Sequence, residues 1–193
     1  MKKILLGIFY IIFFATSTFS ENKINPIYEG SSDAKIELIV YESLTCGHCA
    51  DFHKNVYPTL KENFVDKGYV KIEFRSFPLD IAGLNASKIA HCRNDGKSDV
   101  LHFLFLNQKK WAKGETIKEI NSNLNKIFST KKYQLDPYKC IENKEIEDHI
   151  LEGRIEAVKK FKINATPTLI INNEKFDKPI TFKNLKKVLE KLI

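Results

Sequence analysis

The segment that most constrains this 193-residue chain is Cys46-Gly47-His48-Cys49, where two residues separate a pair of cysteines. Strand-forming residues precede it and a helical pattern follows it. At a helix start, unpaired backbone N–H groups and the positive end of the helix dipole favour thiolate over thiol at Cys46. His48 can add positive charge or a hydrogen bond and lower the pKa of Cys46 further. The pattern predicts a dithiol redox site, in which one cysteine attacks and the other resolves.

The same spacing is also half of a zinc site. No second Cys-x-x-Cys or Cys-x-x-His pair follows in the sequence. We therefore favour the redox interpretation and expect neither a metal nor another cofactor.

Residues 1–20 have the pattern of a secretory signal peptide. Lys2 and Lys3 form a positive start, an apolar run extends from Ile4 to Ala15, and small residues stand at Thr18 and Ser20. The alternative is a retained membrane anchor, but the apolar run is shorter than the roughly 17–25 residues that span a bilayer. Export predicts a compartment in which disulfides persist, here the periplasm.

The formal charge of +7 comes from many scattered lysines. They alternate with Asp and Glu and do not form one basic stripe. This distribution is typical of a solvated surface, so we expect no nucleic-acid partner.

Two strands are predicted around the cysteines. The segment Ile36–Tyr41 has apolar residues on both faces, which favours a central strand, and Tyr69–Phe74 alternates cleanly. Between them a helix is expected from Cys46 to about Asp66, with a kink or break near Val56 because Pro58 removes an internal hydrogen bond. The resulting β-α-β unit requires a parallel strand pair.

The rest of the chain divides into a helical part and a final β-β-α part. Helical patterns continue from Asp80 to about Phe161, and Asp136-Pro137 opens one of these helices. The other expected elements are an edge strand near Ile27 and Tyr28, helices around Ile89–Cys92, Val100–Trp111, Ile117–Ile127 and Glu145–Lys160, strands at Leu169–Ile171 and Lys175–Phe176 joined by a turn at Asn172-Asn173, and a last helix capped by Thr181.

This order of elements and three segments resemble the DsbA-like thiol-disulfide oxidoreductases. The segments are Ser43–Cys49, Phe74–Asp80 and Ala165–Thr168, and the resemblance covers essentially the whole chain after the signal. It implies an α/β, thioredoxin-like fold with an inserted all-helical domain. The implied boundaries are a signal peptide at 1–20, a thioredoxin-like domain at 21–80 and 162–193, and an inserted helical domain at 81–161.

The resemblance also implies roles for individual residues. Cys46 corresponds to the exposed attacking cysteine and Cys49 to the buried resolving one. Pro167 corresponds to a cis-proline that faces the dithiol, and the backbone of Thr166 before it is expected to pair with an extended substrate segment.

A second disulfide and a set of partners follow from the same resemblance. Cys92 and Cys140 match a structural disulfide found in one branch of the family. The expected function is the introduction of disulfides into reduced or unfolded exported proteins. Reoxidation is expected from a membrane quinone-linked oxidase of the DsbB type, and the protein is expected to be a monomer.

The chain departs from the family pattern at two positions. Many relatives have proline at Gly47, so the motif leaves an isomerase or reductase open as an alternative to an oxidase, although no evident dimerisation arm precedes Ile36. A non-enzymatic metal carrier using Cys46, His48 and Cys49 is a further alternative.

Relatives also often carry a buried acid where this chain has Val40. Glu42 lies on the same strand face and can substitute for it, but a solvated position near the strand end is the favoured expectation.

Overall fold

The computed structural model describes residues 23–129 and 131–193, and the predicted signal peptide at 1–20 lies outside them. The described residues form a five-stranded sheet with the order β1-β3-β2-β4-β5. Strands β2 and β3 are parallel, and the other neighbours are antiparallel. The strands are β1 (Ile27–Glu29), β2 (Ile36–Glu42), β3 (Val70–Ser76), β4 (Thr168–Ile171) and β5 (Glu174–Lys175).

Strand β2 lies at the centre of the sheet, as its two apolar faces predict. Leu38 and Val40 belong to one hydrophobic cluster, whereas Ile39 and Tyr41 belong to another. All four side chains are almost completely buried. The central strand therefore ends inside the protein and delivers the chain directly to the cysteine pair.

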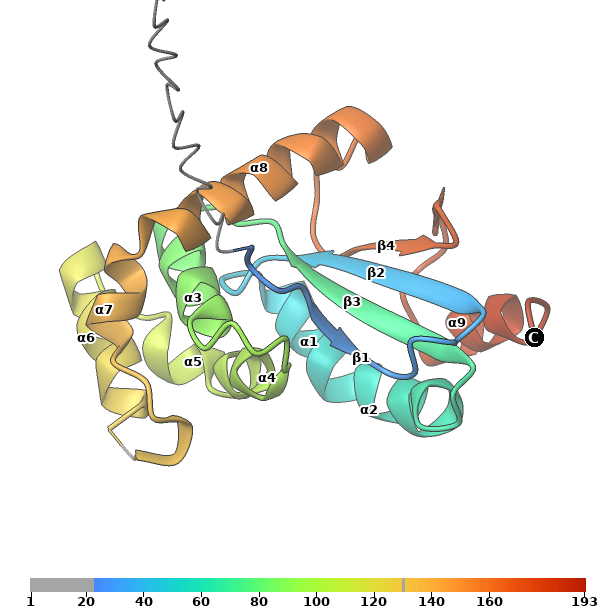
Figure 1. The fold of residues 1–193 in the computed structure, drawn as a ribbon, viewed down its shortest axis with the longest axis horizontal. Coiled ribbons are helices and arrows are strands. Elements are labelled where there is room, and N and C mark those ends of the chain that lie inside the picture. The colour runs from blue at the N-terminus through green and yellow to red at the C-terminus, as the bar shows by residue number, and fades with distance from the viewer. Residues whose placement is uncertain (1–22, 130) are drawn as a thin grey trace, which may run out of the picture.

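Helices cover both faces of this sheet (Figure 1). On one face lie α1 (Gly47–Asn55), α2 (Tyr57–Leu60) and α9 (Phe182–Leu189), which contribute to the larger cluster. The other face packs against α8 (Lys144–Phe161) through the smaller cluster. This layering is the thioredoxin fold.

The predicted break in the first helix is confirmed. Helix α1 ends at Asn55, α2 begins at Tyr57, and Pro58 occupies the first turn of the second piece. A π-helical turn, η1 (Lys61–Val65), then completes the segment. The proline thus separates the turn that carries the cysteines from the rest of the helical segment.

Between β3 and β4 the described residues form helices and connecting turns. The expected helix over Val100–Trp111 is broken at Asn107, whose side-chain amide donates to the Phe103 carbonyl and competes with the helix ladder. The helices before α8 are α3 (Ile81–His91), α4 (Asp99–Leu106), α5 (Gln108–Trp111), α6 (Ile117–Ile127), the short 3₁₀ turn η2 (Lys131–Tyr133) and α7 (Pro137–Glu142).

The end of the chain follows the predicted β-β-α order. Asn172 and Asn173 have φ values of 47° and 69°, the left-handed conformation that a tight hairpin turn requires. The second strand starts at Glu174, one residue earlier than expected, and Thr181 caps α9. Within the part of the chain that the structure describes, no helix is long and apolar enough to cross a membrane.

Candidate active site

Cys46 is the N-terminal cap of α1. Its backbone is extended, with φ −77° and ψ 122°, and its Sγ accepts a hydrogen bond from the Cys49 N–H at 3.4 Å. Both cysteines are free thiols; Cys46 is partly exposed and Cys49 is fully buried. The helix start therefore presents one sulfur to the surface and holds the second beneath it.

The two sulfurs have opposite acidities. Hydrogen bonds lower the pKa of Cys46 from 9.0 to about 5; the largest contribution comes from the Cys49 thiol, and others come from Thr166 and from the backbone N–H groups of Cys49 and His48, against an opposing effect of partial burial. Burial raises the pKa of Cys49 far above its usual range, and the neighbouring Cys46 and the charge of Glu42 raise it further. At neutral pH Cys46 is thus a thiolate and Cys49 a thiol.

The peptide bond between Thr166 and Pro167 is cis. It brings the Thr166 carbonyl oxygen to 3.3 Å from Cys46 Sγ. A groove of about 700 Å³ extends from this point between α1 and the β4–β5 region, lined among others by His48, Phe52 and Phe176. The attacking sulfur consequently lies beside a surface that can receive an extended chain.

His48 and Gly47 occupy the exposed turn between the cysteines. The backbone N–H of His48 is among the groups that lower the pKa of Cys46. A Cβ built at Gly47 meets no heavy atom within 4 Å among the described residues, so this position has room for a side chain. A tuning effect of the imidazole, or of glycine at position 47, stays a prediction.

A side chain of α5 contacts the loop before Cys46, and the sequence analysis did not predict this contact. Gln108 Nε2 donates to the carbonyl oxygens of Leu44 at 2.7 Å and of Cys46 at 3.0 Å. No local pattern singles out this glutamine, because its partners are backbone atoms more than sixty residues away. It connects the position of the nucleophile to the position of α5.

The expectation that Glu42 is a solvated residue is wrong. Its side chain is 2% exposed, and its Oε2 lies 2.7 Å from Nε2 of His53, which is equally buried. Glu42 shares the face of Val40 and therefore points toward α1 and not toward solvent. His53 is thus an internally satisfied side chain, with partners at both ring nitrogens.

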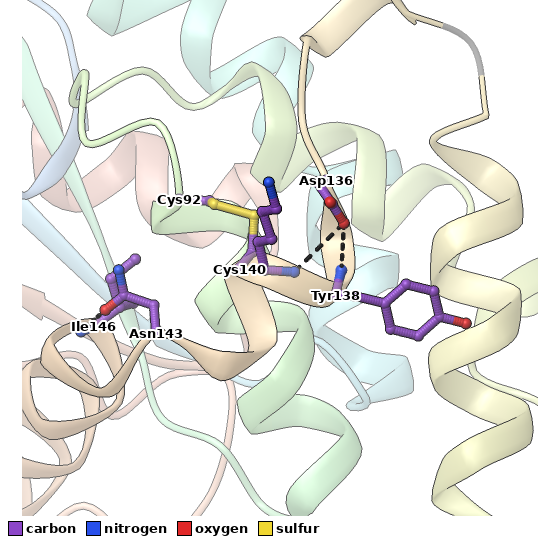
Figure 2. Close-up of a disulfide and its surroundings, with 7 residues drawn as sticks. Cys92, Asp136, Tyr138, Cys140, Asn143 and Ile146 are labelled. Carbon is purple, nitrogen blue, oxygen red and sulfur yellow. Dashed lines mark hydrogen bonds between the residues drawn. A yellow bond between two sulfur atoms is a disulfide. The ribbon is translucent and has the colours of Figure 1, made fainter.

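Cys92 and Cys140 form a disulfide that joins the end of α3 to α7, as Figure 2 shows. Their Cα atoms are 5.4 Å apart. Asp136 caps α7 just before Cys140 by accepting from the Tyr138 and Lys139 N–H groups. This is the pairing that the family resemblance implies, and it lies in the helical part of the chain, whereas the Cys46–Cys49 pair lies at the sheet.

In the described residues, no three side chains of His, Cys, Asp or Glu are grouped so that they could hold a metal ion. The chemistry that the geometry of the site supports is that of its two sulfurs. One is a stabilised nucleophile, and the other is a buried partner close enough to close a disulfide.

Comparison with known proteins places this geometry in a family. The family model described as Thioredoxin matches residues 22–191. The crystal structure of Wolbachia pipientis alpha-DsbA1 is 31% identical in sequence and superposes with a TM-score of 0.78. That match covers 87% of this chain and 90% of the Wolbachia chain.

Curated relatives of lower sequence identity also have names that refer to disulfide chemistry. A Rickettsia bellii protein named as a protein-disulfide oxidoreductase is 28% identical over 152 residues, or 77% of this chain. The chain spans only 57% of the length of that relative. The Disulfide bond formation protein D of Bacillus subtilis is 24% identical over 172 residues, with 84% of this chain and 74% of that protein matched.

Proposed function

Because the chain belongs to the DsbA-like family of thioredoxin-fold proteins, we propose that it is a thiol-disulfide oxidoreductase that donates the Cys46–Cys49 disulfide to reduced proteins. The observation that carries the proposal is the opposite acidity of the two sulfurs. Cys46 has a pKa of about 5, whereas burial raises the pKa of Cys49. Cys46 is therefore a good leaving group when a mixed disulfide with substrate is resolved, and Cys49 is its protected partner.

The proposed reaction proceeds through a mixed disulfide. A substrate thiolate attacks Cys46 Sγ, a substrate–Cys46 bond forms, and the Cys46–Cys49 bond breaks with its electron pair leaving on Cys49, which takes up a proton. A second substrate thiolate then attacks the substrate sulfur and expels the Cys46 thiolate. The substrate loses two electrons and gains a disulfide, and the enzyme gains the two electrons.

The low pKa of Cys46 supports the oxidising direction. A stabilised thiolate stabilises the reduced enzyme, and this makes its disulfide a stronger oxidant. The corresponding pKa is roughly 3.5 in the strongly oxidising DsbA and about 7 in thioredoxin, so a value of about 5 lies between them. We therefore expect a redox potential between their values of about −120 mV and about −270 mV.

The surface around Thr166 supports a peptide substrate. Its backbone precedes the cis-proline and faces Cys46, where an extended segment can add to it by main-chain hydrogen bonds. The adjoining groove contains the apolar side chains of Phe52 and Phe176 as well as Asp51 and Lys175. A mixed lining of this kind suits unfolded proteins of varied sequence.

Export and recycling complete the proposal. The pattern of residues 1–20 and the Cys92–Cys140 disulfide both favour an oxidising compartment, the periplasm. After each turnover the reduced dithiol needs a disulfide donor. By analogy with the family this is a membrane oxidase of the DsbB type.

Oxidation of a reduced, unfolded protein by the purified disulfide form tests the proposal. We expect one substrate disulfide for each enzyme disulfide, and weak activity on scrambled disulfides. The redox potential is measured by equilibration with glutathione. A potential at or below that of thioredoxin, about −270 mV, would contradict the oxidase and favour a reductase.

A further inference from the structure

Four titratable side chains form a continuous hydrogen-bonded line behind the cysteine pair. Glu42 Oε2 lies 2.7 Å from His53 Nε2, and His53 Nδ1 lies 3.0 Å from His102 Nδ1. The other nitrogen of that ring, His102 Nε2, lies 2.7 Å from Glu29 Oε1. The four residues come from β2, α1, α4 and β1, so the line joins the sheet to the inserted helices.

This line runs from the interior to the surface. At the inner end the side chains of His53 and Glu42 are 1% and 2% exposed. At the outer end those of His102 and Glu29 are 19% and 14% exposed. The inner end is also close enough to Cys49 for the charge of Glu42 to raise the pKa of that thiol. One end therefore lies within electrostatic reach of the buried sulfur, and the other end is partly exposed.

Aromatic rings fix the two imidazoles in place. His53 stacks on Phe105 with ring centroids 4.1 Å apart and an interplanar angle of 15°. His102 stacks on Tyr57 at 4.4 Å and 26°. The rings also pack against Phe74. Confinement on both sides keeps each ring nitrogen directed at its partner.

The hydrogen-bond count permits proton transfer without any rotation of a ring. The three hydrogen bonds need three protons, one for each. In one arrangement Glu42 is protonated and Glu29 is a carboxylate; in the other Glu29 is protonated and Glu42 is a carboxylate. Both histidines are neutral in both arrangements, with opposite tautomers. Moving each proton across its own bond converts one arrangement into the other and moves one charge between the ends.

Cys49 and His53 are four residues apart on one face of α1, and there His53 occupies Oε2 of Glu42 but not Oε1. This oxygen is buried and has no hydrogen-bond partner among the described residues, so its lone pairs are free. At the outer end Glu29 has further donors: Tyr57 at 2.5 Å and Ser98. Burial opposes ionisation of Glu29, but its hydrogen bonds with His102, Ser98 and Tyr57 outweigh burial and lower its pKa to about 2.

From this geometry we propose that Glu42, His53, His102 and Glu29 form a proton relay that connects the buried Cys49 thiol with solvent. The inference rests on the proposed function. When the Cys46–Cys49 bond breaks, the electron pair that leaves on Cys49 takes a proton from Glu42. The shift of protons along the relay restores Glu42, and water supplies a proton at the outer end. During reoxidation by a partner disulfide, the proton of Cys49 leaves by the same route.

Disulfide exchange at this site requires a proton to be transferred to or from Cys49. A thiolate at Cys49 is disfavoured by burial, so the bond cannot break or form readily unless a proton moves at nearly the same time. The titratable groups that face the relay from the surrounding elements are Cys49 on α1 and Tyr57 on α2. Within residues 23–129 and 131–193, neither group provides a second line of hydrogen bonds to the surface.

Glutamine variants of the two histidines test the relay. His53→Gln and His102→Gln keep a polar side chain but cannot pass a proton through an amide. The readout is the rate at which dithiothreitol reduces the Cys46–Cys49 disulfide, followed by acid trapping of thiols as a function of pH. We expect rates at least about tenfold lower, toward the ~100-fold effect typical of a lost acid–base group. The pKa of Cys46, measured by thiolate absorbance, should stay unchanged. His149→Gln on α8, outside the line, is the matched control and should react at the wild-type rate.

Chemical rescue separates proton transfer from a structural role. His102 is partly exposed, so His102→Ala opens a cavity that imidazole from solution can enter; added imidazole should restore most of the rate. The same treatment should not rescue His53→Ala, because that position is closed to solvent.

Two results would overturn the relay. The first is a wild-type rate in both glutamine variants at every pH. The second is a loss of rate accompanied by a raised Cys46 pKa and insensitive to imidazole, which would assign the histidines a structural role. The proposed function fails separately: dithiothreitol reduces the disulfide of an oxidase or a reductase alike, so only an unreactive wild-type protein counts against the redox site itself.

Discussion

The two cysteine pairs of this molecule differ in where they lie on their helices, and this difference separates reactive from structural sulfur. Cys46 caps the N-terminus of α1, whereas Cys92 is at the C-terminal cap of α3. The positive end of a helix dipole stabilises a thiolate, and the negative end does not. Cys140, the partner of Cys92, is 1% exposed. One pair therefore contains an accessible sulfur whose thiolate is stabilised, and the other contains a bond with one buried sulfur.

Sequence separation adds to the contrast. A bond between Cys46 and Cys49 would close a small ring within one helical turn and would constrain the unfolded chain very little. Cys92 and Cys140 are 48 residues apart and close a large loop. The first pair is suited to electron exchange and the second to stability.

Removing the attacking sulfur should have the largest effect. We expect Cys46→Ser to abolish oxidation of a reduced protein substrate, because serine forms no disulfide and no mixed intermediate. Cys49→Ser should instead accumulate a mixed disulfide between Cys46 and substrate, visible by non-reducing electrophoresis. Residual stoichiometric oxidation by Cys46→Ser would mean that the other pair can exchange with substrate.

The converse change tests the structural pair. The double variant Cys92→Ser/Cys140→Ser should lower the free energy of unfolding by about 4 kcal/mol on the chain-entropy estimate for a 48-residue loop. Below its melting temperature it should oxidise substrate as the wild type does. Denaturant unfolding measures the first expectation, and mass spectrometry of a non-reducing digest of the wild type should find the Cys92–Cys140 peptide. Alkylation of both thiols without reduction would contradict the pairing.

The pairs should also differ in how pH affects stability. In the reduced protein Cys46 has a pKa of about 5, against an ordinary 9.0. Because the folded state favours the thiolate, the reduced form gains stability as the pH rises from about 5 to about 9 and loses it as the pH falls through 5. The disulfide form has no titrating Cys46 and lacks this contribution.

The difference between the unfolding midpoints of the two forms measures this effect. The midpoint of the reduced form minus that of the disulfide form should increase as the pH rises from about 5 to about 9. Glu29, whose pKa is lowered to about 2, contributes equally to both forms and cancels in the difference. A difference that does not depend on pH would mean that Cys46 is not a stabilised thiolate.

The parts that were predictable from the sequence are those that local chemistry determines. The central strand follows from its two apolar faces, the helix break follows from Pro58, and the hairpin follows from Asn172-Asn173. Each depends on residues within a few positions of one another. The position of Cys46 at a helix start belongs to the same class.

The environment of Glu42 and the role of Gln108 were not predictable in this way. Alternation placed Glu42 on the correct strand face, but its burial depends on His53 and on His102, which α4 brings in from another part of the chain. Gln108 reaches the backbone of Leu44 only after the helices have packed. Polar networks between distant segments leave no periodic signal, because each member is a single residue without a local partner.

The smallest expected effect concerns the imidazole between the reactive cysteines. His48→Ala should raise the pKa of Cys46 and make its disulfide less oxidising, because the thiolate loses a nearby positive charge or hydrogen bond. The shift should be modest: the hydrogen bonds of Cys46 with Cys49, with Thr166 and with the backbone N–H of residue 48 remain after the substitution. Since His48 is exposed, water also screens its charge. Thiolate absorbance gives the pKa, and equilibration with glutathione gives the potential. An unchanged pKa would assign all of the tuning to the helix terminus and its hydrogen bonds, and the contrast between the two cysteine pairs would then depend on backbone position alone.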